Sequence, residues 1–353
     1  MKKFLKILFY FILFLVIAFA GLIATAMITD YNPKEKTLVF ESADSQKLSD
    51  SLKFTIISWN IGYCGLDKTM DFFYDGGTHV RPAKENVINS LKGVIGFLKK
   101  QDSIDFILLQ EVDKKSKRSY RINEYDSIQA AFPTFKSYFG TNYDVFFVPT
   151  PPTEPYGKVL SGIVSLSRFQ PSNVTRYSFP GKYDFPKYLF MLDRCFLVKR
   201  FPLQNGKEFI LINTHNEAFD DGSQRKAQME YLRNFLYAEY KKGNYIIVGG
   251  DWNQCPPGLQ TSFPGYVFNN KDYMPIKPSY ISDDWKWIFK NNVPSNRSVI
   301  KPYDKNTIAT TVIDFFLISP NIENIGIENI DLGFENSDHN PVKAKFRLKK
   351  NTK

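Results

Sequence analysis

The sequence is poor in cysteine and histidine, and the motifs of several large enzyme classes are missing from it. Its 353 residues include three cysteines, Cys64, Cys195 and Cys255, none of them in a CxxC pair. A small, odd number of cysteines does not build a disulfide framework. The chain also lacks a GxxxxGK[ST] phosphate-binding loop, a GxSxG nucleophile motif, a Cys/His cluster of zinc spacing and any repeat of fixed period. These absences argue against a P-loop nucleotidase, a serine hydrolase of the GxSxG type and a zinc module.

Aromatic residues and positive charge are abundant. Aromatics make up 16% of the chain, with 32 Phe and 20 Tyr, which favours a globular, strand-rich body. The length suits one large domain or two smaller ones. The net charge of +10 suits an anionic partner, either a nucleic acid or a lipid surface. Lysine-rich runs such as residues 114–118 are equally compatible with an ordinary solvated surface.

The N-terminal 29 residues predict a membrane segment. Three lysines precede Ile7 to Ile28, a run of 22 residues without a charge, which as a helix spans about 33 Å and can cross a bilayer. The run is longer than the apolar core of a usual signal peptide, which favours an uncleaved anchor, and the lysines before it, with no comparable cluster directly after it, favour a body outside the cytoplasm. The alternative is a signal peptide cleaved after Ala20 or Ala26, which would release a secreted protein. Residues 30–52 are polar and predict a linker, residues 53–348 form the main domain, and 349–353 a short tail.

Hydrophobic periodicity predicts alternating strands and helices in the main domain. Helices are expected over residues 82–100 and 223–242, where apolar side chains recur on one face. Aromatic, proline-rich loops are expected around residues 143–156 and 177–188. Short apolar runs predict strands at 54–60, 104–111, 159–166, 209–215, 245–253, 312–318 and 342–348. The pattern indicates an α/β domain with helices packed outside two sheets.

Polar residues close several of these strands. They are Asn60, Glu111, His215, Asp251 with Asn253, and Asp338 with His339, which precede the last strand. As a set they offer carboxylates for a hard divalent cation, amides for a phosphate and imidazoles for proton transfer. Any one of them alone is compatible with a turn, and Asn60 and Asn253 in particular could simply cap turns.

Six short motifs resemble the DNase I-like endonuclease/exonuclease/phosphatase superfamily and occur in its order across residues 53–348. The motifs are Ser58-Trp59-Asn60, Leu109-Gln110-Glu111-Val112, Asn213-Thr214-His215, Gly250-Asp251-Trp252-Asn253, Ile313-Asp314-Phe315 and Ser337-Asp338-His339-Asn340-Pro341-Val342. The resemblance implies an α/β fold of the α+β kind, a four-layer sandwich in which helices flank two packed, mainly antiparallel sheets. It also implies hydrolysis of phosphoester bonds assisted by Mg²⁺ or Mn²⁺.

Residue by residue, the resemblance implies a metal site and a set of proton-handling groups. Glu111 is similar to the principal metal carboxylate, with Asn60 and Asp338 beside it. Asp251 resembles the acid that activates the attacking water, and Asn253 a phosphate contact.

His339 resembles the terminal catalytic imidazole, held by Asp314, whose carboxylate within an apolar strand needs a partner. His215 resembles a second histidine that contacts phosphate or protonates the leaving oxygen. Arg194 is a candidate phosphate contact or one half of a surface ion pair.

The sequence alone does not decide the class of substrate. We expect an extracytoplasmic nuclease, which suits the basic charge. A phospholipid or sphingomyelin phosphodiesterase, or a phosphatase, at the membrane surface is the alternative, and a non-catalytic binding module on the same fold is the third. Val312-Ile313-Asp314 departs from the Arg-hydrophobic-Asp pattern of the abasic-site nucleases. The sequence contains no feature that indicates a protein partner.

Overall fold

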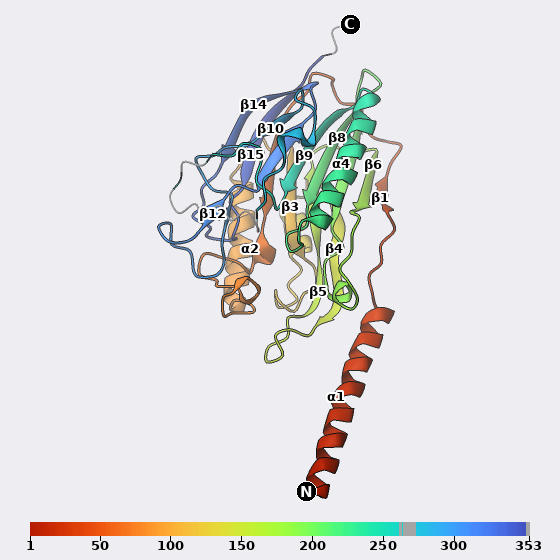
Figure 1. Cartoon of the computed structure of the whole chain (residues 1–353). Coiled ribbons are helices and arrows are strands. Elements are labelled where there is room, and N and C mark those ends of the chain that lie inside the picture. Colours follow the sequence, from red (N-terminus) through yellow and green to blue (C-terminus); the bar gives the residue numbers. More distant parts are fainter. Residues whose placement is uncertain (261–262, 264–272, 351–353) are drawn as a thin grey trace.

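The computed structural model describes residues 1–260, 263 and 273–350, and it has a helix–sheet–sheet–helix sandwich with one further helix outside it (Figure 1). The α-helices are α1 (Lys2–Ile28), α2 (Lys84–Lys99), α3 (Glu124–Ala131) and α4 (Ser223–Lys241). The first eight strands are β1 (Lys36–Glu41), β2 (Lys53–Asn60), β3 (Phe106–Asp113), β4 (Lys136–Val148), β5 (Gly157–Ser167), β6 (Asn173–Ser178), β7 (Cys195–Pro202) and β8 (Glu208–His215). The remaining strands are β9 (Tyr245–Asp251), β10 (Lys286–Ile288), β11 (Asn296–Arg297), β12 (Thr310–Thr311), β13 (Asp314–Ile318), β14 (Ile322–Asn329) and β15 (Val342–Leu348). Four 3₁₀ turns complete the described elements: η1 (Gly62–Cys64), η2 (Phe73–Asp75), η3 (Lys187–Phe190) and η4 (Pro278–Tyr280).

Two mixed sheets form the centre of the molecule. The seven-stranded sheet has the order β1-β6-β7-β8-β9-β13-β10, and the six-stranded sheet has the order β14-β15-β2-β3-β5-β4. Neighbours in both sheets are antiparallel except for β2 with β3 and β8 with β9. Each parallel pair is joined through a helix, α2 or α4, because parallel neighbours need a long crossover. The predicted four-layer sandwich is therefore confirmed.

The sandwich contains one core between the sheets and one beneath each helical layer. Phe54, Phe106 and Phe209 pack in the core between the two sheets. Leu232 and Leu236 of α4 pack on the outer face of the seven-stranded sheet, and α2 covers the six-stranded sheet in the same way. In a strand that is buried on both faces, nearly every residue is apolar. The sequence therefore predicted β3, β8 and β9 from their continuous apolar runs.

The predicted linker is corrected in part by the structure. Residues 36–41 form β1, which pairs with β6 at the edge of the seven-stranded sheet, and Leu48 is buried in the inter-sheet core. The polar composition of residues 30–52 concealed this strand, because only one of its faces rests on the protein. The predicted loop around residues 143–156 is likewise shorter, since β4 continues to Val148.

α1 is a 27-residue helix that leaves the sandwich at the end opposite the C-terminus (Figure 1). After Lys6 its side chains carry no charge, and they are exposed except for the half-buried Leu22 and Ile23 and the buried Ala26. Length and composition make it a candidate membrane span. A helix that is apolar all round and does not pack in a protein core is typical of a membrane segment or a signal sequence.

Candidate active site

The polar residues that close the predicted strands converge at one end of the two sheets. β2 and β3 run in parallel in one sheet and β8 and β9 in the other, so their C-terminal residues reach the same edge. Asp314 at the start of β13 pairs in register with Asp251 at the end of β9. The segment before β15 then brings His339 to the same place. The polar residues that end the predicted strands therefore lie together in one site.

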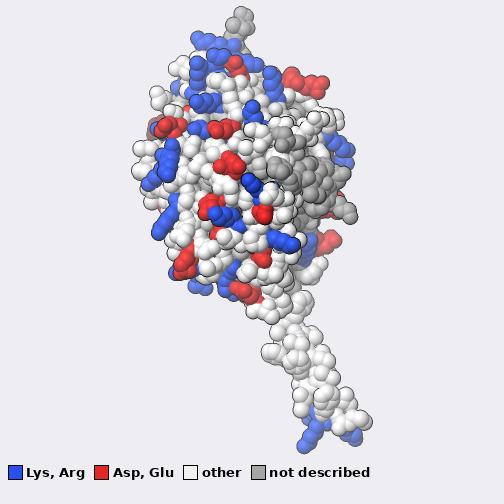
Figure 2. Space-filling model, turned by 90° about the vertical axis from the view of Figure 1, so that its left-hand side faces the viewer, with Lys and Arg blue, Asp and Glu red and all other residues white. Residues whose placement is uncertain are grey.

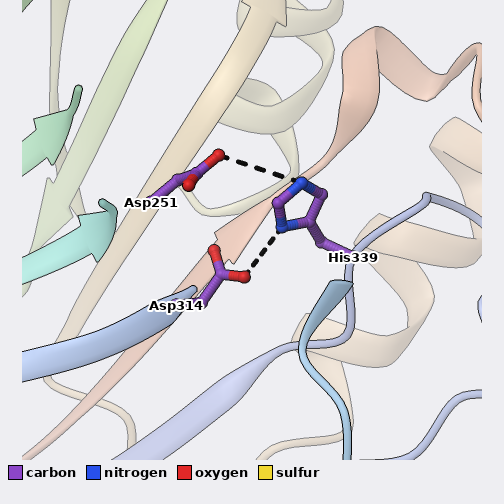
Figure 3. Close-up of side chains that lie close together, drawn as sticks. All are labelled: Asp251, Asp314 and His339. Atoms are coloured by element: carbon purple, nitrogen blue, oxygen red, sulfur yellow. Dashed lines mark hydrogen bonds and ion pairs between the residues drawn. The ribbon is translucent and has the colours of Figure 1, made fainter. Parts of the chain in front are cut away.

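Asp314, His339 and Asp251 form a buried row (Figure 3). The Nδ1 atom of His339 lies 2.8 Å from Oδ2 of Asp314, and Nε2 lies 3.8 Å from Oδ2 of Asp251. Burial disfavours the imidazolium, but the charges of Asp314 and Asp338 outweigh it and raise the pKa of His339 to about 10. His339 is therefore a cation held between two carboxylates, and the predicted contact with Asp314 is present.

Two residues that sequence reasoning missed support this row. The hydroxyl of Ser295 donates to Oδ2 of Asp314 at 2.7 Å and accepts from the backbone N–H groups of Ile313 and Asp314. The amide of Asn296 lies 3.0 Å from Nε2 of His339, and its own Oδ1 otherwise has no partner. An imidazolium Nε2 donates, so the amide turned to present Oδ1 satisfies both atoms. Both residues lie in or beside the two-residue strand β11, which leaves no recognisable sequence signal.

Each carboxylate oxygen of Asp251 accepts one hydrogen bond. Its Oδ1 accepts from the backbone N–H of Asn253 at 2.8 Å, and its Oδ2 accepts from Nδ2 of Asn60 at 3.0 Å. Burial and the nearby Asp314 raise the pKa of Asp251 to about 6, against the opposing effect of His339. A carboxylate with a pKa near neutrality suits the role of a general base.

Glu111, Asn60 and Asp338 bring carboxylate and amide oxygen atoms close to this row. Nδ2 of Asn60 donates to Oε1 of Glu111 at 3.2 Å, while Oδ1 of Asn60 accepts from the N–H of Gly62, the turn contact that its residue type also allows. Burial, with Glu111 as a further contributor, raises the pKa of Asp338. A divalent cation would offset the charge of two neighbouring carboxylates, and oxygen ligands of this kind fit Mg²⁺ or Mn²⁺.

A second set of ligand atoms is also compatible with a metal. One ligand atom from each of Asp251, Asp314 and His339 lies within 4.8 Å of the others. The hydrogen bond between Asp314 and His339 already uses the atoms that face each other. A metal at that point would have to break this bond, so we favour the oxygens of Glu111, Asn60 and Asp338.

Glu111 and Asp338 are placed by unusual backbone conformations. Glu111 lies at a bulge between β3 and β5 and has a positive φ of 54°. Gly62 also has a positive φ, and a Cβ atom there would come within 2.7 Å of Oδ1 of Asp338. Positive φ at a non-glycine residue is costly and concentrates at functional positions. The position of Glu111 therefore depends on a bulge with positive φ, which hydrophobic periodicity does not reveal.

His215 is neutral and is bound to Arg194. Nη1 of Arg194 lies 2.7 Å from Nε2 of His215, and because arginine only donates, Nε2 is the acceptor. Burial, then Arg194 and His339, hold the pKa of His215 well below its usual value. Nε2 of His215 also lies 3.6 Å from Oδ2 of Asp251. In this arrangement Nε2 of His215 carries no proton, so this atom can neither protonate a leaving group nor donate to a phosphate, and its contact is with Arg194.

Arg194 is corrected from a surface position to a buried one. Its side chain is 3% exposed, and its Nε lies 3.7 Å from Oε2 of Glu217 and has no hydrogen-bond partner. The ion-pair alternative is therefore present as a buried pair with Glu217 and not at the surface, and Arg194 lies beside His215. A small pocket of about 60 Å³, open to solvent, begins at Arg194 and Glu217.

Asn253 has a positive φ of 49° and follows a glycine that cannot be replaced freely. Gly250 has a φ of 146°, and a Cβ atom there would lie 2.1 Å from the carbonyl oxygen of Thr214. Nδ2 of Asn253 donates to the carbonyl oxygen of Asn216 at 2.9 Å, which fixes the amide beside Asp251.

A buried basic group lies beneath the site and was not predicted. Arg118, counted in the sequence among solvated lysine-rich residues, is 6% exposed and forms a two-bond pair with Asp113. Its guanidinium lies 3.7 Å from the ring centre of Tyr63 and donates to the hydroxyl of Tyr156. The charge of Arg118 contributes to the low pKa of His215, so this group is coupled to the site.

The fold and the site together define a phosphoester-hydrolysing enzyme built on two packed sheets. The chain belongs to the Endonuclease/Exonuclease/phosphatase family, whose profile matches residues 57–339. Enzymes of this family hydrolyse phosphoester bonds, typically with a divalent metal. No curated protein matches the chain.

Several solved structures share the fold of this chain. ANGEL2, a 2′,3′-cyclic phosphatase, is 16% identical with a TM-score of 0.53, covering 90% of this chain and 99% of that one. The endonuclease/exonuclease/phosphatase from Bacteroides vulgatus is 15% identical with a TM-score of 0.52, covering 84% and 100%. The human Nocturnin catalytic domain with a bound sulfate is 13% identical with a TM-score of 0.52, covering 86% and 96%. At these identities the likeness concerns the fold alone.

Proposed function

We propose that this protein is a divalent-metal-dependent phosphodiesterase that acts outside the cytoplasm, with its catalytic domain anchored by α1. The observation that carries the catalytic part is the row Asp314–His339–Asp251 beside the oxygens of Glu111, Asn60 and Asp338. A base, an imidazolium and a set of metal ligands then lie on one side of the space where a phosphate would bind.

In this mechanism Asp251 accepts a proton from the attacking water, whose oxygen forms the new bond to phosphorus. Asn60 and the N–H of Asn253 keep the carboxylate oriented for that transfer. The imidazolium of His339, fixed by Asp314, stabilises the charge that grows on the phosphorane oxygens. The bond from phosphorus to the leaving oxygen then breaks, and this oxygen takes a proton from solvent water and departs as the alcohol. Arg194, ordered by His215, offers its guanidinium to the same phosphate.

Glu111, Asp338 and Asn60 would hold Mg²⁺ or Mn²⁺, which supplies charge neutralisation and polarises the phosphate. The fit rests on two carboxylates and an amide oxygen, hard ligands that suit either ion, in a site where nearby histidines already have other partners.

A nuclease is the substrate assignment that the sequence favours, through the net charge of +10. The distribution of that charge weakens the argument. Lys and Arg are interspersed with Asp and Glu on the face drawn in Figure 2, without a continuous basic band there. Lys2, Lys3 and Lys6 contribute to the excess but lie at the far tip of α1.

The test measures hydrolysis by the full-length protein in detergent. Bis(p-nitrophenyl) phosphate reports diester cleavage, supercoiled plasmid reports nuclease activity and p-nitrophenyl phosphate reports monoester cleavage. We expect diester cleavage with Mg²⁺ or Mn²⁺ and none with EDTA.

The variant His339→Ala should lose at least about 100-fold in kcat, because it removes the imidazolium. His79→Ala is the matched control, since His79 is exposed and also contacts a carboxylate, that of Asp71. Near-normal activity in His339→Ala with folding verified would contradict the assignment. Absence of hydrolysis in the metal-loaded wild type would favour a non-catalytic binding module.

A further inference from the structure

The catalytic end of the sandwich is also the end at which α1 is attached. The ladder of the seven-stranded sheet places Lys36 opposite Tyr177, Tyr177 opposite Phe196, and Phe196 opposite Thr214. The first residue of β1 is therefore level with the residue before His215. Three strand spacings separate them, about 14 Å across the sheet.

The chain between α1 and β1 is bound to the domain and leaves little slack. Nζ of Lys182 donates to Oδ1 of Asn32 at 2.9 Å, and the hydroxyl of Ser178 donates to the carbonyl oxygen of Lys34 at 2.8 Å. The backbone N–H of Ser178 donates to the carbonyl oxygen of Glu35, also at 2.8 Å. The end of α1 itself packs against β4 and η3.

This attachment limits how far the site can lie from a membrane that contains α1. Only eight residue steps separate Ile28 from Lys36, which span at most about 29 Å when fully extended. Since residues 32–35 are bound along the protein, the domain has no flexible tether by which to turn its catalytic end away.

The loops that project beyond this end carry exposed aromatic side chains. Phe185, just before η3, is 60% exposed, and Phe219, just after β8, is 57% exposed. Phe146 near the tip of the β4–β5 hairpin is also exposed. The hydroxyl of Tyr74 donates to the carbonyl oxygen of Thr150 at that tip, so the η2 turn belongs to the same surface. Aromatic side chains are enriched where proteins meet the interfacial region of a bilayer.

We propose that this surface, formed by the loops that carry Phe146, Phe185 and Phe219, rests on the bilayer that contains α1 and turns the catalytic site toward it. The substrate is then the phosphodiester of a membrane lipid headgroup. The pocket beside Arg194 is also lined by Asn32 of the bound segment and by Tyr183, so it connects the site to the segment that follows α1. This inference rests on the proposed phosphodiesterase function and on α1 spanning a bilayer.

The first experiment measures orientation without activity. Full-length protein is reconstituted in vesicles of phosphatidylcholine, phosphatidylethanolamine and phosphatidylglycerol. Cys64, Cys195 and Cys255 are buried, so a cysteine introduced at an exposed position can be labelled selectively. A polarity-sensitive fluorophore on Phe185→Cys should shift to shorter wavelength and be quenched by spin-labelled lipid.

Ile325→Cys is the matched control, because Ile325 is an exposed apolar residue on β14, outside these loops. Its fluorophore should respond to neither the vesicles nor the quencher. Equal quenching at the two positions, or none at Phe185→Cys, would overturn the proposed orientation.

The second experiment compares a bilayer substrate with a soluble one on the same vesicles. Wild-type protein should release headgroups from the vesicle lipids and also cleave bis(p-nitrophenyl) phosphate. The double variant Phe185→Ser/Phe219→Ser should lose at least about tenfold on lipid and remain within about twofold on the soluble diester. Ile325→Ser should change neither rate.

The outcomes separate this inference from the proposed function. Cleavage of the soluble diester or of plasmid DNA, with intact vesicle lipids, would reject the lipid substrate and leave the phosphodiesterase standing. Absence of cleavage of every substrate with Mg²⁺ and Mn²⁺ present would reject the phosphodiesterase itself. Equal losses on lipid and soluble substrate in the double variant would also reject a membrane role for these loops.

Discussion

Replacing Asp314 by Asn tests the central contact of the site with little change in shape. Oδ2 of Asp314 lies 2.8 Å from Nδ1 of His339 and accepts a second hydrogen bond from Ser295. An amide oxygen can accept both bonds, so Asp314→Asn removes a buried negative charge and keeps the packing. We expect the imidazolium of His339 to become less stable and kcat to fall.

The expected fall in the pKa of His339 follows from the hydrogen bond to Asp314, whose acceptor becomes uncharged in Asp314→Asn. A hydrogen bond to a charged group contributes about 1.5–3 kcal/mol, and one pKa unit corresponds to about 1.4 kcal/mol. The pKa of His339, raised to about 10 in the native protein, should fall by at least about one to two units. Because the native pKa lies above that of the unfolded chain, this pair stabilises the fold at neutral and low pH, and the contribution is lost as pH rises toward 10. Asp314→Asn should remove much of that dependence.

The assay combines histidine NMR with kinetics. The chain has only three histidines, His79, His215 and His339, so their imidazole signals can be assigned by single substitutions. In metal-free wild type the signal of His339 should not titrate between pH 6 and pH 8, whereas in Asp314→Asn it should move to a lower pKa. On the metal-loaded enzyme we expect kcat to fall about 10²- to 10⁴-fold with a smaller change in KM. An unchanged titration together with a kcat within about threefold of wild type would refute the reasoning.

Three further substitutions test other parts of the structure. Glu111→Gln should weaken Mn²⁺ binding at least about tenfold by calorimetry, because it removes a carboxylate ligand, and unchanged binding would place the metal elsewhere. Gly250→Ala should destabilise the protein by more than about 2 kcal/mol in urea unfolding, since its Cβ would lie 2.1 Å from the carbonyl oxygen of Thr214, and a neutral result would contradict that geometry. Lys199 is buried near the ring of Phe106 without a hydrogen-bond partner, and burial holds its pKa well below the usual value. The unfolded chain therefore binds one proton more between the two pKa values, so wild-type stability rises with pH there by up to about 1.4 kcal/mol per unit. Lys199→Met should stabilise the protein at neutral pH and remove that slope, and a slope unchanged by the substitution would argue against a buried neutral amine.

The predicted secondary structure was most accurate where burial leaves a periodic trace. The helical pattern at residues 223–242 matches α4, which ends at Lys241, and the apolar run at 209–215 matches β8. The edge strand β1 was missed, because its apolar residues are few and two of them, Leu38 and Val39, are exposed. Edge strands rest on the protein through one face only, and they carry a weaker hydrophobic signal than central ones.

The sequence by itself determined which residues meet at the catalytic edge. Polar residues at the ends of successive apolar strands converge whenever those strands share a sheet edge, so Asn60, Glu111, Asp251 and His339 were identifiable without coordinates. Their support was not identifiable. Ser295 and Asn296 contact Asp314 and His339 from a separate loop, and no local pattern encodes a contact between distant segments.

Charge states and orientation were decided only by the tertiary structure. The opposite states of the two site histidines depend on their neighbours, since His215 faces the guanidinium of Arg194 and His339 faces carboxylates. The end of the domain at which α1 is attached follows from the register of β1 with β6. A sequence records the order of residues and their local preferences, whereas electrostatic coupling and direction relative to a membrane arise when the sheets are assembled.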